Sequence, residues 1–261
     1  MRPLLAACLL ALGAPAAALA QAGPAPATPP ATPTFLSRSA FLVGFAHLTS
    51  DDPRFVWDAR VNADVDVLDY GRGRINFWGT YEGLLGSERR LLDLNHENFV
   101  VEGSASYRIQ ASELSLAFHH VSRHLSDRAN PDVVAWNTLT FRAAHTMTAR
   151  GTRYHGFLEA SRVLQHTYVD YAWTSLLQVD LERPINARTS FVAIGTGQLV
   201  GIDPSRSTRD RQCGARAEAG IQFSGRTGAV EFYVAYERRI DAYPLARQRA
   251  RWFEVGFKLM G

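Results

Sequence analysis

The stretch RFVWDARVNADVDVL, residues 54–68, decides the fold class of this chain. From Phe55 to Val67 an apolar residue stands at every second position, and most residues between them are Asp, Arg or Asn. Successive side chains of a β-strand point to opposite faces, so this period of two predicts a strand with one apolar and one polar face. An amphipathic helix would repeat its apolar residues with a period near 3.6. The stretch therefore predicts a strand that separates two different environments.

The same alternation recurs along the chain and predicts an even number of strands. Short turns, such as residues 150–151, alternate with longer polar loops, such as residues 85–97 and 123–133. This pattern is typical of bacterial outer-membrane barrels. We predict an all-β fold, a transmembrane antiparallel up-and-down β-barrel of about 12 strands, with its long loops outside the cell. The predicted strands are residues 39–48, 55–68, 74–84, 98–109, 113–122, 134–149, 152–163, 170–181, 189–199, 212–223, 229–238 and 251–259.

Alternation alone does not say which face of the sheet points inward. A secreted soluble barrel that binds an apolar ligand would have the same period with its apolar face inside. Two features favour the membrane: the polar faces carry several charges in a row, and aromatic residues concentrate near strand ends, as in interfacial girdles. These aromatic residues are Trp57, Tyr70, Phe77, Tyr81, Phe99, Tyr107, Trp136, Tyr171 and Trp173. A closed barrel also removes the unpaired strand edges that a bilayer does not tolerate.

The two ends of the chain resemble the targeting signals of an outer-membrane protein. Residues 1–20, with Arg2 before an apolar run and small residues at the end, predict a secretory signal peptide. A lipoprotein processing site at Cys8 is the alternative. Residues 21–37 are rich in Ala and Pro and predict a flexible leader, which leaves residues 38–261 for the barrel. The alternating last strand resembles the C-terminal signal of such barrels, which implies the outer-membrane assembly machinery as a partner.

Composition excludes several other classes of protein. The net charge of +3 is too small to indicate nucleic acid as a partner. Beyond the signal peptide only Cys213 remains, so the chain has no intramolecular disulfide and no Cys/His zinc pattern. No run of 18 apolar residues follows the signal peptide, so no transmembrane helix is predicted.

The hairpin AFHHVSRHLSDRANPDVVAWNTLTF, residues 117–141, interrupts the lipid-facing pattern with polar residues. His120, Ser122 and Asn137 stand where apolar residues are expected. If paired residues of this hairpin have numbers that sum to 257, His120 lies opposite Asn137, with β-carbons about 5 Å apart. Ser122 lies two residues beyond His120 on the same face, about 6.6 Å along the strand. The three can form a triad in which the amide orients an imidazole that removes the proton of the hydroxyl.

Residues 120–122 (His-Val-Ser) and 135–137 (Ala-Trp-Asn) resemble the active-site hairpin of the outer-membrane phospholipase A family. The motif of that family runs His-x-Ser-Asn-Gly and, after a loop, Ser-Trp-Asn. The resemblance implies a twelve-stranded lipid hydrolase in which Ser122 is the nucleophile, His120 the base and Asn137 the orienting amide. It also implies phospholipid or lipopolysaccharide as substrate, calcium as a cofactor with no other cofactor, and a homodimer.

The resemblance covers about 25 residues, and the chain departs from the motif within them. Arg123-His124 replaces Asn-Gly after the serine, and the Ser-Arg that precedes Ser-Trp-Asn is absent. The run also looks like a His-x-Ser-x-His-Leu-Gly-Asp pattern of uncharacterised bacterial barrel proteins, which would imply no activity. The loop after the serine offers oxygen atoms for calcium, although an acidic loop is more often simply solvated: Ser126, Asp127, Asn130 and Asp132.

Each candidate residue also has a structural interpretation. His120, Ser122 and Asn137 can be interfacial residues above the hydrocarbon, and the protein can be a non-enzymatic barrel, either a narrow channel or a surface protein. His119 is predicted to face the lumen, and His120 and His124 lie about 13 Å apart along the strand, too far to bind one metal ion. Ion pairs among lumen charges are expected to fill the barrel; these residues are Asp58, Arg60, Asp64, Asp66, Glu102, Arg108, Arg142, Arg216, Glu218 and Glu237.

Overall fold

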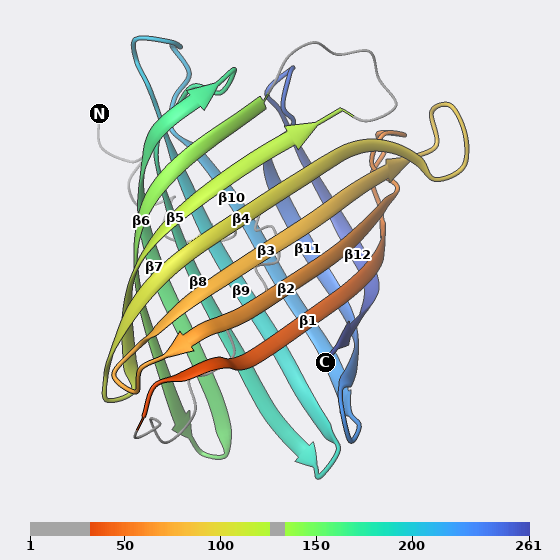
Figure 1. Cartoon of the computed structure of the whole chain (residues 1–261). Helices are drawn as coiled ribbons and strands as arrows, with labels where there is room; N and C mark the ends of the chain where they lie inside the picture. Colours follow the sequence, from red (N-terminus) through yellow and green to blue (C-terminus); the bar gives the residue numbers. More distant parts are fainter. Residues whose placement is uncertain (1–31, 126–133) are drawn as a thin grey trace, which may run out of the picture.

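The computed structural model describes residues 32–125 and 134–261, which form a closed barrel of twelve antiparallel strands (Figure 1). Within these residues no helix is long and apolar enough to cross a membrane. The predicted fold class and strand number are confirmed. The strands are β1 (Thr34–Leu48), β2 (Trp57–Asp69), β3 (Arg74–Gly86), β4 (Asp93–Ile109), β5 (Ser112–His124), β6 (Val134–Ala149), β7 (Thr152–Thr167), β8 (Tyr171–Asn186), β9 (Thr189–Ile202), β10 (Gln212–Ser224), β11 (Ala229–Tyr243) and β12 (Gln248–Met260).

Each strand pairs with its neighbours in chain order, and β1 pairs with β12 to close the barrel. The closing register places Leu42 opposite Met260 and Leu48 opposite Glu254. Closure gives every strand two hydrogen-bonded partners, as a hydrocarbon environment requires. Connections of two to four residues lie at the end of the barrel where β1 begins and β12 ends (Figure 1). Connections of three to nine residues lie at the opposite end, called the loop end below.

Several strands are longer than the hydropathy pattern predicts. At the loop end, β4 begins at Asp93 rather than at residue 98, and β11 continues to Tyr243 rather than ending at 238. At the other end, β8 continues to Asn186, through residues predicted to form a turn, and β1 begins at Thr34, within the predicted leader. The barrel wall therefore extends past the apolar band. Alternation marks only the part of a strand that separates lipid from lumen.

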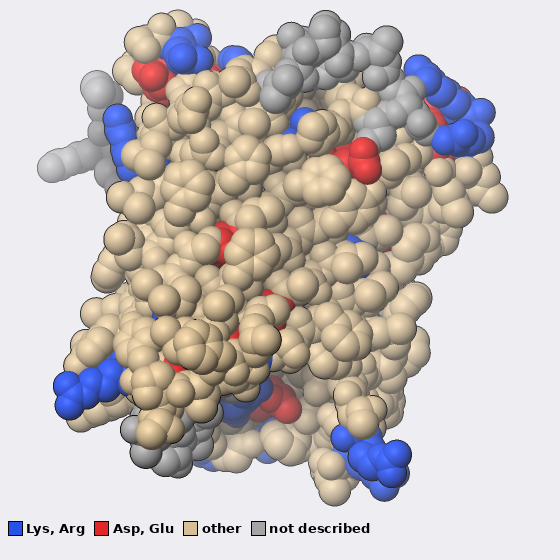
Figure 2. All heavy atoms as spheres, in the orientation of Figure 1, with Lys and Arg blue, Asp and Glu red and all other residues tan. Residues whose placement is uncertain are grey.

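Large apolar side chains cover the outside of the barrel wall. Phe41, Leu116 and Phe253 are exposed by 57%, 56% and 60%. In Figure 2 charged side chains gather at the two ends, and the wall between them shows only small charged patches. A soluble protein rarely exposes an apolar surface of this extent, whereas a bilayer requires it. The prediction of an outer-membrane barrel is therefore confirmed, and the alternative of a soluble barrel with an apolar interior is wrong.

The interior of the barrel is filled by ion pairs. Arg216 lies 2.6 Å from Glu254, and Arg142 lies 2.7 Å from Glu102 and 2.6 Å from Glu159. Each of the ten predicted lumen charges takes part in at least one such pair. These pairs bring side chains of opposite charge together within the lumen of the described barrel.

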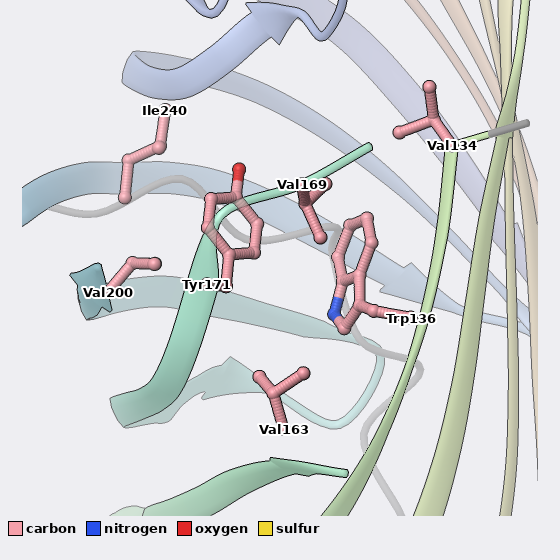
Figure 3. Close-up of a cluster of buried hydrophobic side chains, with 7 residues drawn as sticks. All are labelled: Val134, Trp136, Val163, Val169, Tyr171, Val200 and Ile240. Atoms are coloured by element: carbon pink, nitrogen blue, oxygen red, sulfur yellow. The ribbon is translucent and has the colours of Figure 1, made fainter. Parts of the chain in front are cut away.

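An apolar cluster lies inside the barrel near the loop end (Figure 3). Trp136 and Tyr171 meet edge to face, with ring centroids 5.4 Å apart. Both were predicted to belong to the interfacial girdle, and for these two residues that prediction is wrong. Trp136 points inward because its neighbour Asn137 occupies the outer face. The cluster consists of Val134, Trp136, Val163, Val169, Tyr171, Val200 and Ile240.

Candidate functional site

The hairpin β5–β6 has the register that the sequence predicts. His120 pairs with Asn137, and Phe118 pairs with Leu139, so the numbers of paired residues sum to 257. Leu139 and Phe118 are exposed on the outer wall, so His120 and Asn137, on the same face, also point outward. The structure thus places two of the predicted site residues side by side at the loop end of the wall.

A hydrogen bond joins the first pair of the predicted triad. Asn137 Oδ1 lies 2.7 Å from His120 Nδ1. An amide oxygen only accepts, so His120 Nδ1 donates, and a neutral ring then carries its free lone pair on Nε2. Asn137 is itself fixed, because its Nδ2 donates to Gln165 Oε1 of β7 at 3.2 Å. The amide is therefore held in place by Gln165 and is hydrogen-bonded to the imidazole of His120.

Ser122 turns towards a different histidine from the predicted one. Among the hydrogen bonds of the described residues, the Ser122 side chain bonds to His124, with 2.6 Å between Oγ and Nε2, and not to His120. His120 and His124 lie two residues before and two residues after Ser122, so both share its outward face. In the structure the serine side chain takes the rotamer that meets His124. The structure brings Asn137 and His120 together and leaves Ser122 hydrogen-bonded to His124.

Strand β4 completes the surroundings of Ser122 on its other side. Phe99 pairs with Ser122, and Glu97 pairs with His124. The Phe99 ring packs edge-on against the His124 ring, with centroids 5.6 Å apart. The hydroxyl of Tyr81, on β3, donates to Glu97 Oε1 at 3.0 Å. Glu97 was not predicted as a site residue, because residues 85–97 lack the alternating pattern of a strand and were expected to form a loop. The two-residue turn between β4 and β5 fixes the register that pairs Glu97 with His124.

The outer face of β5 also fixes the depth of the site. Its apolar residues are Leu114, Leu116 and Phe118, so Leu116 marks the middle of the apolar band. Each residue advances about 3.4 Å along a strand, and a tilt of about 40° reduces this to about 2.6 Å along the membrane normal. His120 then lies about 10 Å and Ser122 about 16 Å from the middle of a band that ends at about 12 Å. The site spans the boundary between acyl chains and headgroups, where the acyl esters of lipids lie.

Two further histidines on this hairpin lie outside the site. His119 faces the lumen, where its Nε2 lies 2.8 Å from Glu102 Oε2, as the sequence predicts for a lumen residue. His145 lies on the outer wall at the opposite end of the hairpin, with its Nδ1 2.9 Å from Ser112 Oγ. The hairpin therefore carries a second exposed Ser–His pair far from the first, which serves below as a matched control.

The described residues do not offer a calcium site. Over residues 32–125 and 134–261, no three or more His, Cys, Asp or Glu side chains gather in a way that could hold a metal ion. The loop oxygens predicted as calcium ligands, on Ser126, Asp127, Asn130 and Asp132, lie outside the described residues. Calcium binding by these four residues therefore stays a prediction, and no chemical step is derived through the ion.

Fold and surface define the class of this chain as a twelve-stranded outer-membrane β-barrel. No family model matches the sequence, and no curated protein matches it. Solved structures do match the fold. Outer membrane phospholipase A from Escherichia coli has a TM-score of 0.52 at 10% identity, over 85% of this chain and 91% of that chain. The calcium-bound outer membrane phospholipase dimer from Salmonella typhi has a TM-score of 0.52 at 11% identity, over 85% and 89%. The KdgM porin has a TM-score of 0.45 at 7% identity, over 84% and 97%. At these identities the likeness shows the fold alone.

Proposed function

We propose that the chain is a lipid acyl hydrolase of the outer membrane, with Ser122 as its nucleophile. One observation carries the proposal: His120, fixed by Asn137 at 2.7 Å, lies beside Ser122 on the outer wall at the level of lipid esters. A hydroxyl, imidazoles and an orienting amide on one patch are the groups that serine-dependent ester hydrolysis needs. Their position matches a substrate that stays in the membrane, either a phospholipid or the acylated part of lipopolysaccharide.

The groups present support a two-step reaction. The oxygen of Ser122 attacks the ester carbonyl carbon while an imidazole accepts the hydroxyl proton, and the same imidazole returns a proton to the departing alcohol. Water then hydrolyses the acyl-serine by the same route and releases the fatty acid. In the assignment made from the sequence, His120 is the imidazole and Asn137 its orienting partner. That assignment requires the Ser122 side chain to rotate from His124 to His120.

The remaining features implied by the phospholipase resemblance stay proposals for this chain. The Salmonella typhi structure is a dimer with bound calcium, and the likeness of fold supports testing both properties here. Membrane lipids are the proposed substrates, and the outer-membrane assembly machinery is the proposed partner during insertion. Calcium dependence is tested in the same assay as the activity.

The test is acyl release from phospholipid in mixed micelles, measured with and without calcium. The wild type is expected to release fatty acid, and Ser122→Ala to lower the rate by at least 100-fold. Ser112→Ala, which removes the hydroxyl of the second Ser–His pair, is the matched control and should leave the rate unchanged. Release that survives Ser122→Ala would contradict the proposal.

A second candidate function is a barrel without enzymatic activity, a surface protein or a narrow channel. The observation that favours it is the network of ion pairs in the interior, since a barrel stabilised in this way needs no catalytic site to be a stable membrane protein. Absence of acyl release together with step-like conductance in planar bilayers would support the channel. Absence of both would support a structural or surface role.

A further inference from the structure

We infer that His124 is the catalytic base that accepts the proton of Ser122, and that Glu97 of the neighbouring strand is its positioning residue. This inference rests on the proposed function and deepens it. It moves the proton-accepting role from His120 to a histidine that the phospholipase motif does not contain. It also extends the site beyond the β5–β6 hairpin, because β3 and β4 contribute side chains.

The first observation is the hydrogen bond of the Ser122 hydroxyl. Its Oγ lies 2.6 Å from His124 Nε2, a short distance for a neutral hydroxyl and imidazole. If the hydroxyl donates, Nε2 is the acceptor that a general base needs, and it already lies within reach of the proton. The base and the nucleophile are thus in contact without any change of rotamer.

The second observation concerns Nδ1, the other nitrogen of the His124 ring. With Nε2 as acceptor, a neutral His124 carries its hydrogen on Nδ1, and that N–H needs an acceptor of its own. Glu97 pairs with His124 across β4 and β5, so their β-carbons lie about 4.5–5.5 Å apart on the same face. The Tyr81 hydroxyl holds the Glu97 carboxylate at 3.0 Å, and the Phe99 ring packs against the imidazole and limits its rotation.

His120 and His124 differ in the charge of the side chain beside each imidazole. During proton transfer the imidazole becomes positively charged, and a carboxylate partner stabilises that charge whereas a neutral amide mainly fixes the tautomer. Glu97 is a carboxylate beside His124, and Asn137 is an amide beside His120. The carboxylate beside it and its hydrogen bond to Ser122 therefore both favour His124 as the base.

The reaction then balances on these atoms. Ser122 Oγ forms a bond to the ester carbonyl carbon, and its proton moves to His124 Nε2. The ester C–O bond breaks, and the proton on Nε2 passes to the oxygen of the leaving lysolipid. Water attacks the acyl-serine, gives one proton to His124 Nε2, and the fatty acid leaves as that proton returns to Ser122. The net reaction is ester plus water to alcohol plus acid, with no oxidation or reduction.

The experiment combines covalent labelling of Ser122 with acyl release, on full-length protein folded into detergent or vesicles. A fluorophosphonate probe measures how reactive the serine is, and phospholipid micelles measure turnover. His124→Ala is expected to lower both rates by at least 100-fold, within the range for loss of a general base. His120→Ala is expected to lower them by less than tenfold. His145→Ala, at the second Ser–His pair, is the matched control and should change neither.

Glu97 is tested by rescue and by pH dependence. Glu97→Gln is expected to lower turnover about tenfold or more and to change the pH profile, and Glu97→Asp to restore part of the rate. If Glu97→Gln keeps the wild-type rate and pH profile, the positioning role is overturned. Heat-modifiable mobility on gels confirms that each variant is a folded barrel, since all substituted side chains lie on the outer wall.

The outcomes separate this inference from the proposed function. Equal losses in both histidine variants, or a larger loss in His120→Ala, overturn the role of His124 while the hydrolase proposal stands. A wild type that neither reacts with the probe nor releases fatty acid overturns the proposed function and this inference with it. Labelling at Ser122 that depends on His124 and not on His120 supports both.

Discussion

A charge placed on the outer face of β5 tests both the membrane position of the barrel and the depth of the site. Leu116 lies in the middle of the apolar band, and His120 lies about 10 Å from it, near the band's edge. We predict that Leu116→Arg destabilises the folded barrel by about 2–4 kcal/mol, whereas His120→Arg costs about 0–1 kcal/mol. The two substitutions introduce the same charge on the same strand and face, so depth is the main difference between them.

The magnitude follows from what each side chain loses. Leu116 is 56% exposed on the barrel wall, and in the bilayer that exposed surface contacts lipid. An arginine there must carry its charge to the boundary over about 12 Å or hold water within the hydrocarbon. At residue 120 the guanidinium reaches the headgroups directly and loses only the hydrogen bond to Asn137. A difference of about 2–3 kcal/mol corresponds to about 30- to 150-fold in the folding equilibrium.

The assay is reversible unfolding by guanidinium in lipid vesicles, followed by tryptophan fluorescence and by gel mobility of the folded barrel. Leu116→Ala removes the side chain without adding charge and separates lost lipid contact from the cost of the charge. If Leu116→Arg is no more destabilising than His120→Arg, residue 116 does not lie at the bilayer centre. The depth assigned to Ser122, and with it the access to lipid esters, would then be wrong.

Three further predictions concern the lumen, the metal and the loops. Glu82→Ala leaves Arg239, to which Glu82 is hydrogen-bonded, as a buried charge without that partner, and should cost about 3–5 kcal/mol in the same unfolding assay. A loss below about 1 kcal/mol would contradict a stabilising role for this ion pair. If calcium acts as the phospholipase resemblance implies, a chelator should abolish acyl release and added calcium should restore it; release unaffected by chelation would remove calcium from the proposal. The side-chain hydrogen bond from Arg54 lowers the pKa of Asp52, in the loop between β1 and β2, below its ordinary value. Because the pKa of Asp52 is lower in the folded state, the pair stabilises the loop above the ordinary Asp pKa and loses that contribution as pH falls through the folded-state pKa. Asp52→Asn should therefore weaken protection of this loop from proteolysis at pH 7 and leave it unchanged at about pH 2. Equal effects at both pH values would contradict the assignment.

The barrel could be predicted from sequence because its wall separates lipid from a charged interior. Residues 54–68 have to alternate if one face contacts hydrocarbon and the other contacts ion pairs, so pattern and fold share one cause. The strand extensions could not be predicted in the same way. Beyond the apolar band both faces of the wall meet polar surroundings, and β4 from Asp93 to residue 97 has no lipid face to mark it. The inward position of Trp136 follows only from its place next to Asn137, because neighbouring side chains of a strand point to opposite faces.

Half of the candidate site could be predicted for the same reason. The register of a hairpin follows from its lipid-facing residues, which is why His120 and Asn137 were expected to pair and do pair. The partner of Ser122 does not follow from register. The residues two before and two after Ser122 lie at equal distances on the same face of the strand. The alternation of β5 therefore does not distinguish His120 from His124 as the partner of Ser122.

What distinguishes the two histidines lies on the strands beside β5. His120 has Asn137 of β6 opposite it on one side and Val101 of β4 on the other, whereas His124 has Glu97 of β4. A charged partner therefore lies beside only one of the two imidazoles that flank Ser122 in these pairings. If a hydrolase uses this patch, its base is chosen by a strand pairing that the hairpin motif does not include. A variant that retains residues 120–122 and Asn137 but replaces Glu97 and His124 should keep the resemblance and lose the activity.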